Sequence, residues 1–565
     1  MPKPQTIEFD WMRGGHDQAS LKKYGCLCYS LSVLEKYPKF GTYTCVTLVG
    51  LFLAWYLFSL TANTTFFVDD WIFFTDRYEW TFSALIESHN GHLSIVPAFV
   101  YICVFKIFGY NNYEVFRLLA LTVHLAICLL VADLVRRRHG WAIAASVGLA
   151  TALMGGGSEN ILWGFQIGSM GGLLFFLVAL RCLQRANNSL GLLWPILTCL
   201  SVGLSVASAS SGLGSIPVIL MLTLFGVHRR RLWWVGVAPL VLYLVWYWQY
   251  GGTGASTYAL STIPGHVARY GAAAMSGFFG VDQRWGWPML GMVLLLLLKS
   301  LWSHRFDVSR LSFLIFVLVF WLGVSYTRGG YGGYGAGRYV YVGVICVILI
   351  ISQSVNTQWV ERSRRSFFVK GSVILLAVLA IWGSHSMMKS YATYVRQDSD
   401  LTLGKLVVVE AHRESVPDET ILITFFGPLL TAGDYFDAID DVGSSPVDGL
   451  KDLANASERV RSSVDATLFS LGLASISNGT DIPMVCFGSV LGNQPLVVSP
   501  GSHVDIHVSR RTAVTMVRFW DLNSYFPVAK QILEPGSYVI TLAADDLGGS
   551  LRAKFDESTA VMTCD

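Results

Sequence analysis

Long apolar stretches alternate with short polar segments along the first two-thirds of the chain. A helix needs about 17–25 mostly apolar residues to cross the hydrocarbon core of a bilayer. The apolar stretches therefore predict about 11 membrane-spanning helices. They lie at 41–60, 115–135, 141–153, 168–183, 190–205, 214–227, 233–250, 287–302, 311–326, 339–352 and 367–387.

Basic clusters mark alternate ends of these stretches, and the positive-inside rule assigns them to the cytoplasm. A basic N-terminal segment at 1–40 predicts a cytoplasmic tail, and all later clusters agree with the same orientation, which puts the C-terminus outside. The clusters are Arg136, Arg137 and Arg138; Arg181 and Arg185; Arg229, Arg230 and Arg231; Lys299, Arg305 and Arg310; and Arg362, Arg364, Arg365 and Lys370.

One further apolar segment, 93–108, does not fit this alternation as a span. Counting it would move Arg136 to the outside and invert every later cluster. We therefore predict that it lies in the outer membrane interface, within a long first outer loop at 61–114. The membrane domain then extends over 41–390.

Composition agrees with a membrane protein. Hydrophobic residues make up 53% of the 565 residues and charged residues only 14%, against roughly a quarter charged in typical globular domains. The formal net charge is +3, so total charge predicts no nucleic-acid partner.

The pattern changes in the last third, at 391–565, where Gly, Pro, Ser and Asp separate short runs of alternating character. After a mixed segment, the runs predict a small β-rich extracytoplasmic domain. Only two of the ten cysteines, Cys486 and Cys564, lie in this polar region. In an oxidising compartment they would pair, and two free thiols are the alternative. The runs are 496–498, 504–508, 513–519 and 538–542.

Two adjacent carboxylates, Asp69 and Asp70, directly follow the first predicted span. At an apolar boundary they repel each other and lose solvation, which can raise the pKa of one of them and suit it to act as a base. The pair could also hold a divalent cation. The alternative is an interfacial helix cap with Trp71 as an aromatic anchor.

A second group, His89-Asn90-Gly91-His92, follows in the same loop. Histidines three positions apart can ligate a metal or hydrogen-bond a phosphate, and Gly91 allows a close backbone approach. His89 and His92 are thus candidate ligands for a divalent cation together with the acidic pair. A structural cap for the interfacial helix explains them equally well.

The second outer loop has three consecutive glycines, Gly155 to Gly157, followed by Glu159 and Gln166. Irregular backbone near a membrane is tolerated where it lines a cavity. We therefore expect Glu159 to face a cavity. Loop flexibility is the alternative reason for the glycines.

Arg328, Arg338 and Tyr339 border a Gly/Tyr-rich fifth outer loop. The planar fork of an arginine suits a lipid phosphate, and the alternative is an ordinary interfacial arginine that snorkels. All of these candidates lie in loops on one predicted side of the membrane. We therefore expect them to converge there on one cavity.

This arrangement resembles the GT-C class of membrane glycosyltransferases, which use polyprenyl-phosphate-linked sugars as donors. The resemblance covers about 41–390 and looks like a bacterial branch of that class. The motifs that carry it are Asp69-Asp70-Trp71, His89-Asn90-Gly91-His92, Phe108-Gly109, Arg117-Leu118, Gly157-Ser158-Glu159 with Trp163 to Gly168, and Gly337-Arg338-Tyr339.

The resemblance implies an inverting sugar transfer on the outer face of the plasma membrane, to a glycan, lipid or protein of the cell envelope. In this class an acidic residue of the first outer loop is the catalytic base, a role that falls to Asp69 or Asp70, with Asp69 favoured. Arg338, and less directly Arg328, would hold the lipid phosphate. No nucleotide is expected, and a divalent cation stays open. The other candidate substrate-binding residues are His89, Asn90, His92, Glu159, Gln166 and Tyr339.

Two other classes compete with this interpretation. A multi-span transporter or flippase would place ionisable groups and broken helices near the bilayer midplane, whereas here the charges gather at span ends and His124 is the clear ionisable group inside a span. A non-catalytic receptor or scaffold would leave the acidic pair and Arg338 without a common purpose.

Overall fold

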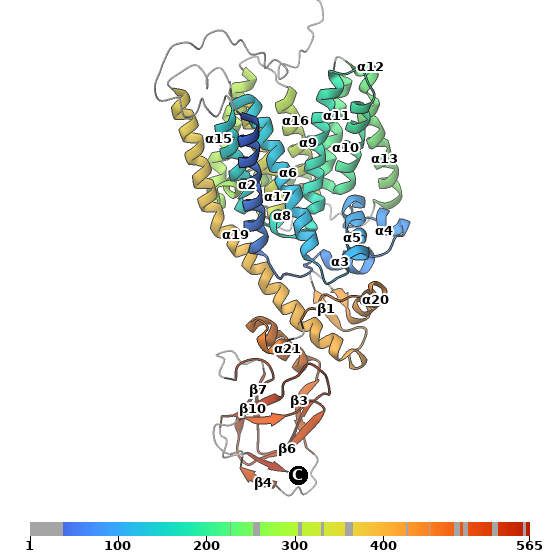
Figure 1. The fold of residues 1–565 in the computed structure, drawn as a ribbon, viewed down its shortest axis with the longest axis vertical. Coiled ribbons are helices and arrows are strands. Elements are labelled where there is room, and N and C mark those ends of the chain that lie inside the picture. Colours follow the sequence, from blue (N-terminus) through green and yellow to red (C-terminus); the bar gives the residue numbers. More distant parts are fainter. Residues whose placement is uncertain are drawn as a thin grey trace, which may run out of the picture. The chain divides into compact units, whose positions relative to one another are not determined.

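The computed structural model divides the chain into two compact units (Figure 1). The helical unit comprises Met1–Ala62, Glu79–Ile102 and Glu114–Thr393, and the C-terminal unit comprises Asn63–Tyr78, Cys103–Tyr113 and Tyr394–Asp565. The C-terminal unit thus includes two pieces of the first loop. The structure describes residues 38–226, 228–251, 260–302, 308–328, 333–355, 365–424, 428–450, 452–479, 486–489, 495–522, 529–556 and 561–564. The predicted tail, apart from its last three residues, and the basic positions Arg305, Arg362 and Arg364 lie outside the described residues.

Each of the predicted spans coincides with a helix. Among the described residues, six helices are long and apolar enough to cross a membrane, or up to seven if one bent pair counts as a span. The multi-pass helical fold is therefore confirmed, while the number of spans stays a prediction. The helices are α2 (Pro38–Leu60), α6 (Glu114–His139), α7 (Trp141–Ala152), α9 (Ile167–Asn187), α10 (Leu193–Ser208), α11 (Ser215–Leu224), α13 (Trp234–Tyr250), α15 (Gly286–Trp302), α16 (Val308–Arg328), α17 (Gly337–Ser354) and α19 (Arg365–Ala411).

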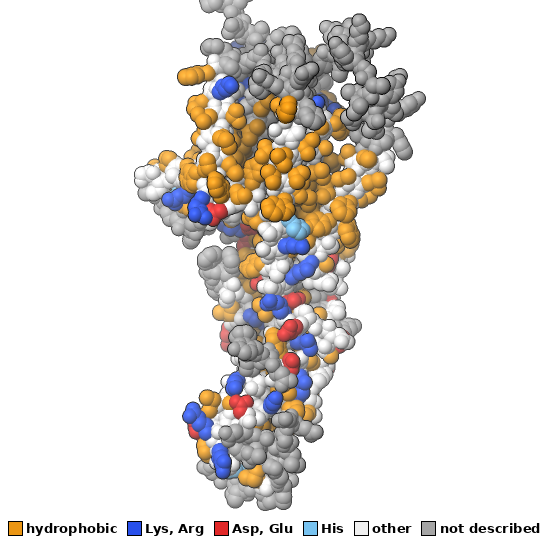
Figure 2. All heavy atoms as spheres, turned by 90° about the vertical axis from the view of Figure 1, so that its left-hand side faces the viewer, with side chains coloured by type: hydrophobic (Ala, Val, Ile, Leu, Met, Phe, Trp, Pro, Cys, Tyr) orange, Lys and Arg blue, Asp and Glu red, His pale blue; other side chains and the backbone are white. Residues whose placement is uncertain are grey.

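Hydrophobic side chains cover much of the helical unit on the face shown in Figure 2. Large apolar side chains that a soluble protein would bury are exposed on several helices, as expected where lipid is the solvent. They include Leu242, Trp248, Leu295, Trp302 and Trp382.

Shorter helices complete this unit. The apolar segment predicted for the interface forms α5 (Ile95–Phe108). A helix that the sequence patterns did not predict, α14 (Ile263–Phe279), buries one face, from Tyr270 to Gly277. The remaining short elements are α4 (Phe82–Ile86), η2 (Gly155–Gly157), α8 (Ser158–Leu162), η3 (Gly164–Gln166), η4 (Ser210–Gly214), α12 (Arg229–Leu232), η5 (Leu260–Thr262) and η6 (Gln283–Trp285).

The three consecutive glycines of η2 allow backbones to touch. A Cβ atom on Gly155 would lie 2.3 Å from the carbonyl oxygen of Ser384, and one on Gly156 would lie 2.5 Å from that of Gly277. Because backbone atoms cannot move aside, any larger residue would push α14 or α19 away. Close packing, rather than loop flexibility, explains these glycines.

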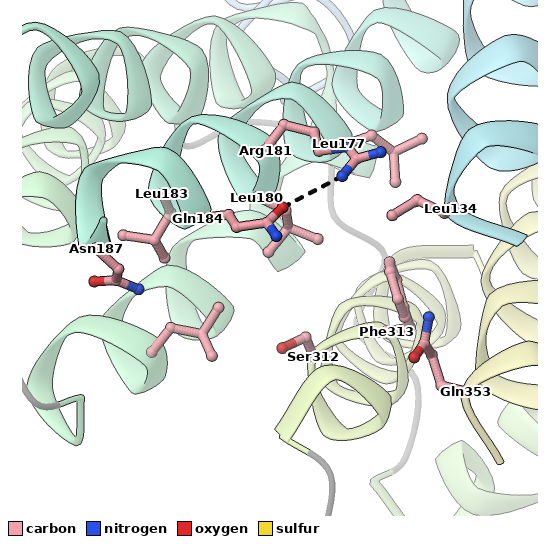
Figure 3. A pocket seen from close by; sticks show the side chains of 11 residues that line it. Leu134, Leu177, Leu180, Arg181, Leu183, Gln184, Asn187, Ser312, Phe313 and Gln353 are labelled. Atoms are coloured by element: carbon pink, nitrogen blue, oxygen red, sulfur yellow. Dashed lines mark hydrogen bonds between the residues drawn. The ribbon is translucent and has the colours of Figure 1, made fainter. Parts of the chain in front are cut away.

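At one end of the bundle, which we name the arginine-rich end, three arginines of α6 and α9 pair with one carboxylate. Asp133 accepts hydrogen bonds from Arg136 at 2.8 Å and Arg137 at 3.0 Å, and it also pairs with Arg181. Beside it, a crevice of about 50 Å³ lies between α9, α16 and α17 (Figure 3). None of the predicted site residues lines this crevice.

The C-terminal unit begins its regular structure with α3 (Asp70–Asp76), a two-stranded hairpin of β1 (Ile421–Thr424) and β2 (Pro428–Thr431), and α20 (Ala432–Val442). After η8 (Arg413–Ser415), η9 (Leu453–Asn455) and α21 (Glu458–Ser470) come two antiparallel sheets, of order β3-β9-β6-β11-β4 and β5-β10-β7-β8. The strands are β3 (Ala474–Asn478), β4 (Cys486–Ser489), β5 (Leu496–Val498), β6 (Ser502–Val508), β7 (Thr512–Val517), β8 (Ala529–Leu533), β9 (Gly536–Leu542), β10 (Leu551–Phe555) and β11 (Val561–Cys564).

All four alternating runs noted in the sequence are strands of these sheets. In β10 the buried residues Leu551, Ala553 and Phe555 alternate with partly exposed ones, as expected for a sheet with one buried face. Cys486 and Cys564 face each other on β4 and β11 and form a disulfide. The β-rich C-terminal region is therefore confirmed, and its two cysteines pair.

Candidate functional site

Glu159 and Arg338 form an ion pair within the helical unit. Arg338 Nη1 donates to Glu159 Oε1 at 3.0 Å, and the backbone N–H of Arg338 donates to Oε2 at 3.2 Å. The carboxylate thereby satisfies an N–H group that has no partner inside α17, and the positive end of the helix dipole stabilises its charge. The Arg338 side chain keeps 30% of its surface exposed, so part of it stays accessible.

Gly337 brings α17 close enough to α8 for this pair to form. A Cβ atom at Gly337 would lie 2.6 Å from the Cβ atom of Glu159 and 3.1 Å from its backbone nitrogen. These are rigid atoms, so glycine is required for the close approach and not for an unusual backbone angle.

Arg338 belongs to a group that we name the Arg–Tyr cluster: Arg269, Tyr270, Arg328, Tyr334 and Arg338. Arg269 donates to the Tyr334 hydroxyl at 3.1 Å, and the rings of Tyr334 and Tyr270 lie 5.2 Å apart. The charges of Arg328 and Arg338 both act on the Tyr270 hydroxyl. Three guanidinium groups and the single Glu159 carboxylate thus leave an excess of about two positive charges here.

The predicted His-Asn-Gly-His motif forms a tight turn. His89 and His92 exchange both backbone hydrogen bonds, at 3.0 and 2.9 Å, and Asn90 and Gly91 between them have φ of +51° and +78°. Two central residues with positive φ are typical of a type I′ turn, which favours Asn-Gly. The turn alone therefore accounts for Asn90 and Gly91 in this motif.

The two histidine side chains have different surroundings. His89 is buried, and its ring lies 5.4 Å from that of Phe165. Burial, and then the positive charge of Arg328, lower the pKa of His92 to about 4. His92 is therefore neutral near pH 7 and lies within electrostatic range of the Arg–Tyr cluster.

A buried hydrogen-bond network supports the elements that carry Glu159 and Arg338. His124 Nδ1 lies 2.8 Å from the Tyr341 hydroxyl, and its Nε2 lies 3.1 Å from the carbonyl oxygen of Ala152. Ala152 ends α7, which leads into η2 and α8, and Tyr341 is one turn beyond Arg338 on α17. One imidazole therefore joins both elements, and it is fully buried.

Tyr339 and Gln166 support the same region. Tyr339 is 8% exposed, and its ring lies 5.3 Å from the Arg338 guanidinium carbon and 5.4 Å from the Tyr270 ring. The Gln166 side chain is buried and accepts a hydrogen bond from Asn160 at 3.4 Å. Tyr339 thus joins the cluster, whereas Gln166 links η3 to α8 through the Asn160 side chain.

The acidic pair lies in the C-terminal unit, where its two members differ. Asp70 is fully buried, and one of its oxygens accepts hydrogen bonds from the Phe67 backbone at 2.9 Å and from the Tyr113 hydroxyl at 2.8 Å. Asp69 is half-buried and stands at the start of α3 without capping it through its side chain. The two carboxylates therefore have different environments.

Backbone strain occurs immediately before Asp69. Val68 has a φ of +47°, which is a true outlier for a β-branched residue and costs on the order of 1–3 kcal/mol. Next to it, Phe66 is fully buried and packs 5.4 Å from Trp71 and 5.0 Å from Tyr113. This packing, together with the bonds to Asp70, holds the strained turn, and strain maintained in this way is common at functional sites.

The structure does not add support for a metal centre. Among the described residues, no group of three or more His, Cys, Asp or Glu side chains is arranged to hold a metal ion. The candidate cation ligands Asp69, Asp70, His89 and His92 stay a prediction.

Sequence patterns missed Arg269 and Tyr270. Both lie on α14, whose apolar positions are too few and too interrupted to resemble a span. The available signal was the helix start, with Pro264 in the first turn, followed by a face of small residues that suits close packing.

The fold and these clusters define a multi-pass membrane protein that presents a group of arginines and tyrosines at one end of its helical bundle, opposite the arginine-rich end. No protein-family model matches the chain, and no curated protein matches it. Two crystal structures of ArnT from Cupriavidus metallidurans are similar to it, one in the apo state and one bound to undecaprenyl phosphate. Their TM-scores are 0.43 and 0.44 at 13% and 14% sequence identity, and each similarity covers 74% of this chain and 91% or 92% of the ArnT chain.

Proposed function

We propose that this protein is a membrane glycosyltransferase that transfers a sugar from a polyprenyl-phosphate donor to an acceptor of the cell envelope. The observation that carries the proposal is the Arg338–Glu159 pair within the Arg–Tyr cluster. A guanidinium fixed by a carboxylate, beside two further arginines, is a suitable site for a phosphate group.

The role of the arginines follows from the charge that develops in the reaction. When the bond between the anomeric carbon and the phosphate oxygen breaks, the lipid phosphate leaves with additional negative charge. Arg338 and Arg328 stabilise that charge, and the preorganised geometry of Arg338 lowers the cost of reorientation during the reaction.

Asp69 is the proposed catalytic base. An acceptor hydroxyl attacks the anomeric carbon while Asp69 takes its proton, so that the carbon–oxygen bond to the acceptor replaces the bond to the phosphate with inversion. Asp70 is unsuited to this role because it is fully buried and already accepts two hydrogen bonds. No nucleotide takes part, since the energy resides in the sugar–phosphate bond.

The proposed reaction takes place on the outer face of the plasma membrane, with the N-terminus in the cytoplasm and the C-terminal unit outside. The arginine-rich end of the bundle supports this orientation through the positive-inside rule. Arg338 begins α17, and Ser352 near its other end lies against His139 of α6, so the Arg–Tyr cluster is at the end opposite the arginine-rich one. In the proposed orientation this end faces outward.

Binding of undecaprenyl phosphate to the purified full-length protein tests the phosphate site. Arg338→Gln removes charge-assisted hydrogen bonds that contribute about 1.5–3 kcal/mol, so we expect a dissociation constant roughly 10- to 100-fold higher. The control is Arg230→Gln, which removes an equal charge from the exposed surface of α12. Equal binding by Arg338→Gln and the unchanged protein would refute the phosphate site.

Transfer itself is tested by mass spectrometry of lipid-linked sugars in cells that lack the protein. We expect a polyprenyl-phosphate sugar to accumulate and one envelope sugar to disappear. The unchanged chain should return both to their normal levels, whereas Asp69→Asn should not. If the protein were a transporter, its loss would instead leave the donor on the cytoplasmic face, where reagents outside the cell cannot reach it.

A further inference from the structure

A second cavity in the helical unit lies between α6, α7, α14, α17 and α19, with a volume of about 280 Å³. Its wall is almost entirely apolar, and its polar lining residues are His139 and Ser352. Its apolar lining includes Val147, Ala150, Val347, Ile348, Val373 and Ala377.

The cavity is large and elongated. An apolar cavity of roughly 150 Å³ in a soluble protein can hold a benzene molecule, and this one is nearly twice that size. Along α17 its lining extends from Val344 to Val355, a distance of about 16 Å at the rise of an α-helix. A single hydrocarbon chain fits such a space, and it would restore the dispersion contacts that an empty wall lacks.

One end of the cavity is polar and lies beside strong positive charge. Ser352 is 8% exposed, and its hydroxyl has no hydrogen-bond partner among the described residues. The nearby Ser354 hydroxyl donates to the Ile350 carbonyl oxygen in the usual helical way. A buried hydroxyl without a partner is costly, so the Ser352 hydroxyl indicates a missing acceptor.

The charge at this end favours an anion. Arg136, Arg137 and Arg138 lie in the last turn of α6, which ends at His139, and His139 Nε2 lies 2.7 Å from the Ser352 carbonyl oxygen. The guanidinium of Arg138 donates to Gln353, the neighbour of Ser352, at 2.8 Å. Basic residues between transmembrane helices at a membrane surface bind anionic lipid headgroups.

We propose that this cavity binds one hydrocarbon chain of an anionic phospholipid, whose ester or phosphate oxygen accepts the hydrogen bond of Ser352 and whose headgroup lies beside Arg138. The lipid fills the space between α19 and the wall formed by α7 and α17; beside this space Ala150 of α7 packs against Ala377 and Ala380 of α19. This site is separate from the Arg–Tyr cluster because the two lie at opposite ends of α17. It does not depend on the sugar transfer.

The test uses the full-length protein in a neutral detergent, with phosphatidylglycerol and phosphatidylcholine as the probes. Native mass spectrometry counts retained lipids, and thermal unfolding measures their effect. We expect one tightly bound phosphatidylglycerol and a higher melting temperature with it than with phosphatidylcholine.

Two variants fill the cavity from different walls. Ala377→Phe should weaken phosphatidylglycerol binding at least tenfold, whereas the control Leu375→Phe, on the exposed face of α19, should leave it unchanged. Val347→Phe fills the cavity from α17 with the same expected loss of binding, and it is used if Ala377→Phe does not fold.

The polar end is tested separately. Ser352→Ala should weaken binding several-fold, and Arg138→Gln should remove the preference for phosphatidylglycerol over phosphatidylcholine, while Arg230→Gln should not. Unchanged lipid retention in a folded cavity-filling variant, or equal retention of the two lipids by the unchanged protein, would overturn the proposal.

Discussion

Gly337→Ala is expected to disable phosphate binding without changing any charged group. The new Cβ atom would lie 2.6 Å from the Cβ atom of Glu159, whereas carbon atoms in contact prefer about 3.5–4.0 Å. The first turn of α17 must therefore move by about 1 Å, which stretches the 3.0 Å pair between Arg338 and Glu159 toward 4 Å. Overpacking of this kind costs about 1–3 kcal/mol, and a displacement of about 1 Å in a site lowers rates by up to roughly 100-fold.

The assay compares undecaprenyl phosphate binding and thermal stability for Gly337→Ala with those for Gly335→Ala, where a Cβ atom meets nothing within 4 Å. We expect at least tenfold weaker binding for the first variant and no change for the second. Full binding by Gly337→Ala would show that the closeness of α17 to α8 does not position Arg338. Equal losses in both variants would show that loop flexibility, and not the ion pair, sets the affinity.

Three further predictions concern the acidic pair, the buried network and the C-terminal unit. Asp69→Asn should reduce transfer about 100- to 10,000-fold in a stable protein, whereas Asp70→Asn should chiefly lower thermal stability, because it disturbs two buried hydrogen bonds. Tyr341→Phe should weaken undecaprenyl phosphate binding in the unchanged protein and have no further effect once Arg338 is replaced by Gln; additive losses would exclude positioning through Arg338. Burial disfavours ionisation of Asp545, but hydrogen bonds from Arg518 and His412 outweigh it and hold its pKa well below the usual value. Its contribution to stability is thus present at neutral pH and is lost as the pH falls below about 4, and Asp545→Asn should cost about 3–5 kcal/mol at pH 7 in chemical unfolding by leaving Arg518 buried without its partner.

Local patterns predicted the long apolar helices and four of the strands, because each of these signals depends on neighbouring residues. Apolar length marks the spans, and alternation marks strands such as β6 and β9. The failure at α14 has a physical reason: its buried face, with Gly271, Ala272 and Ala273, packs through small residues that contribute little hydropathy.

The site was only partly predictable, because its geometry depends on contacts between distant residues. Glu159 and Arg338 are 179 positions apart, and nothing near either one indicates the other. The glycines next to them were visible, but whether a glycine serves flexibility or close approach depends on the atoms that face it. At Gly337 those atoms belong to Glu159.

The acidic pair shows how identical neighbouring residues acquire different tasks. Asp70 is fully buried and accepts two hydrogen bonds, one of them from Tyr113, which is 43 positions away. Its burial keeps Asp70 away from solvent, so it is poorly placed to take a proton from a substrate. The same bonds maintain the strain that presents Asp69. On the proposed function, Asp70 would contribute to activity by holding its neighbour in place, and its loss should lower stability first and reaction rate as a consequence.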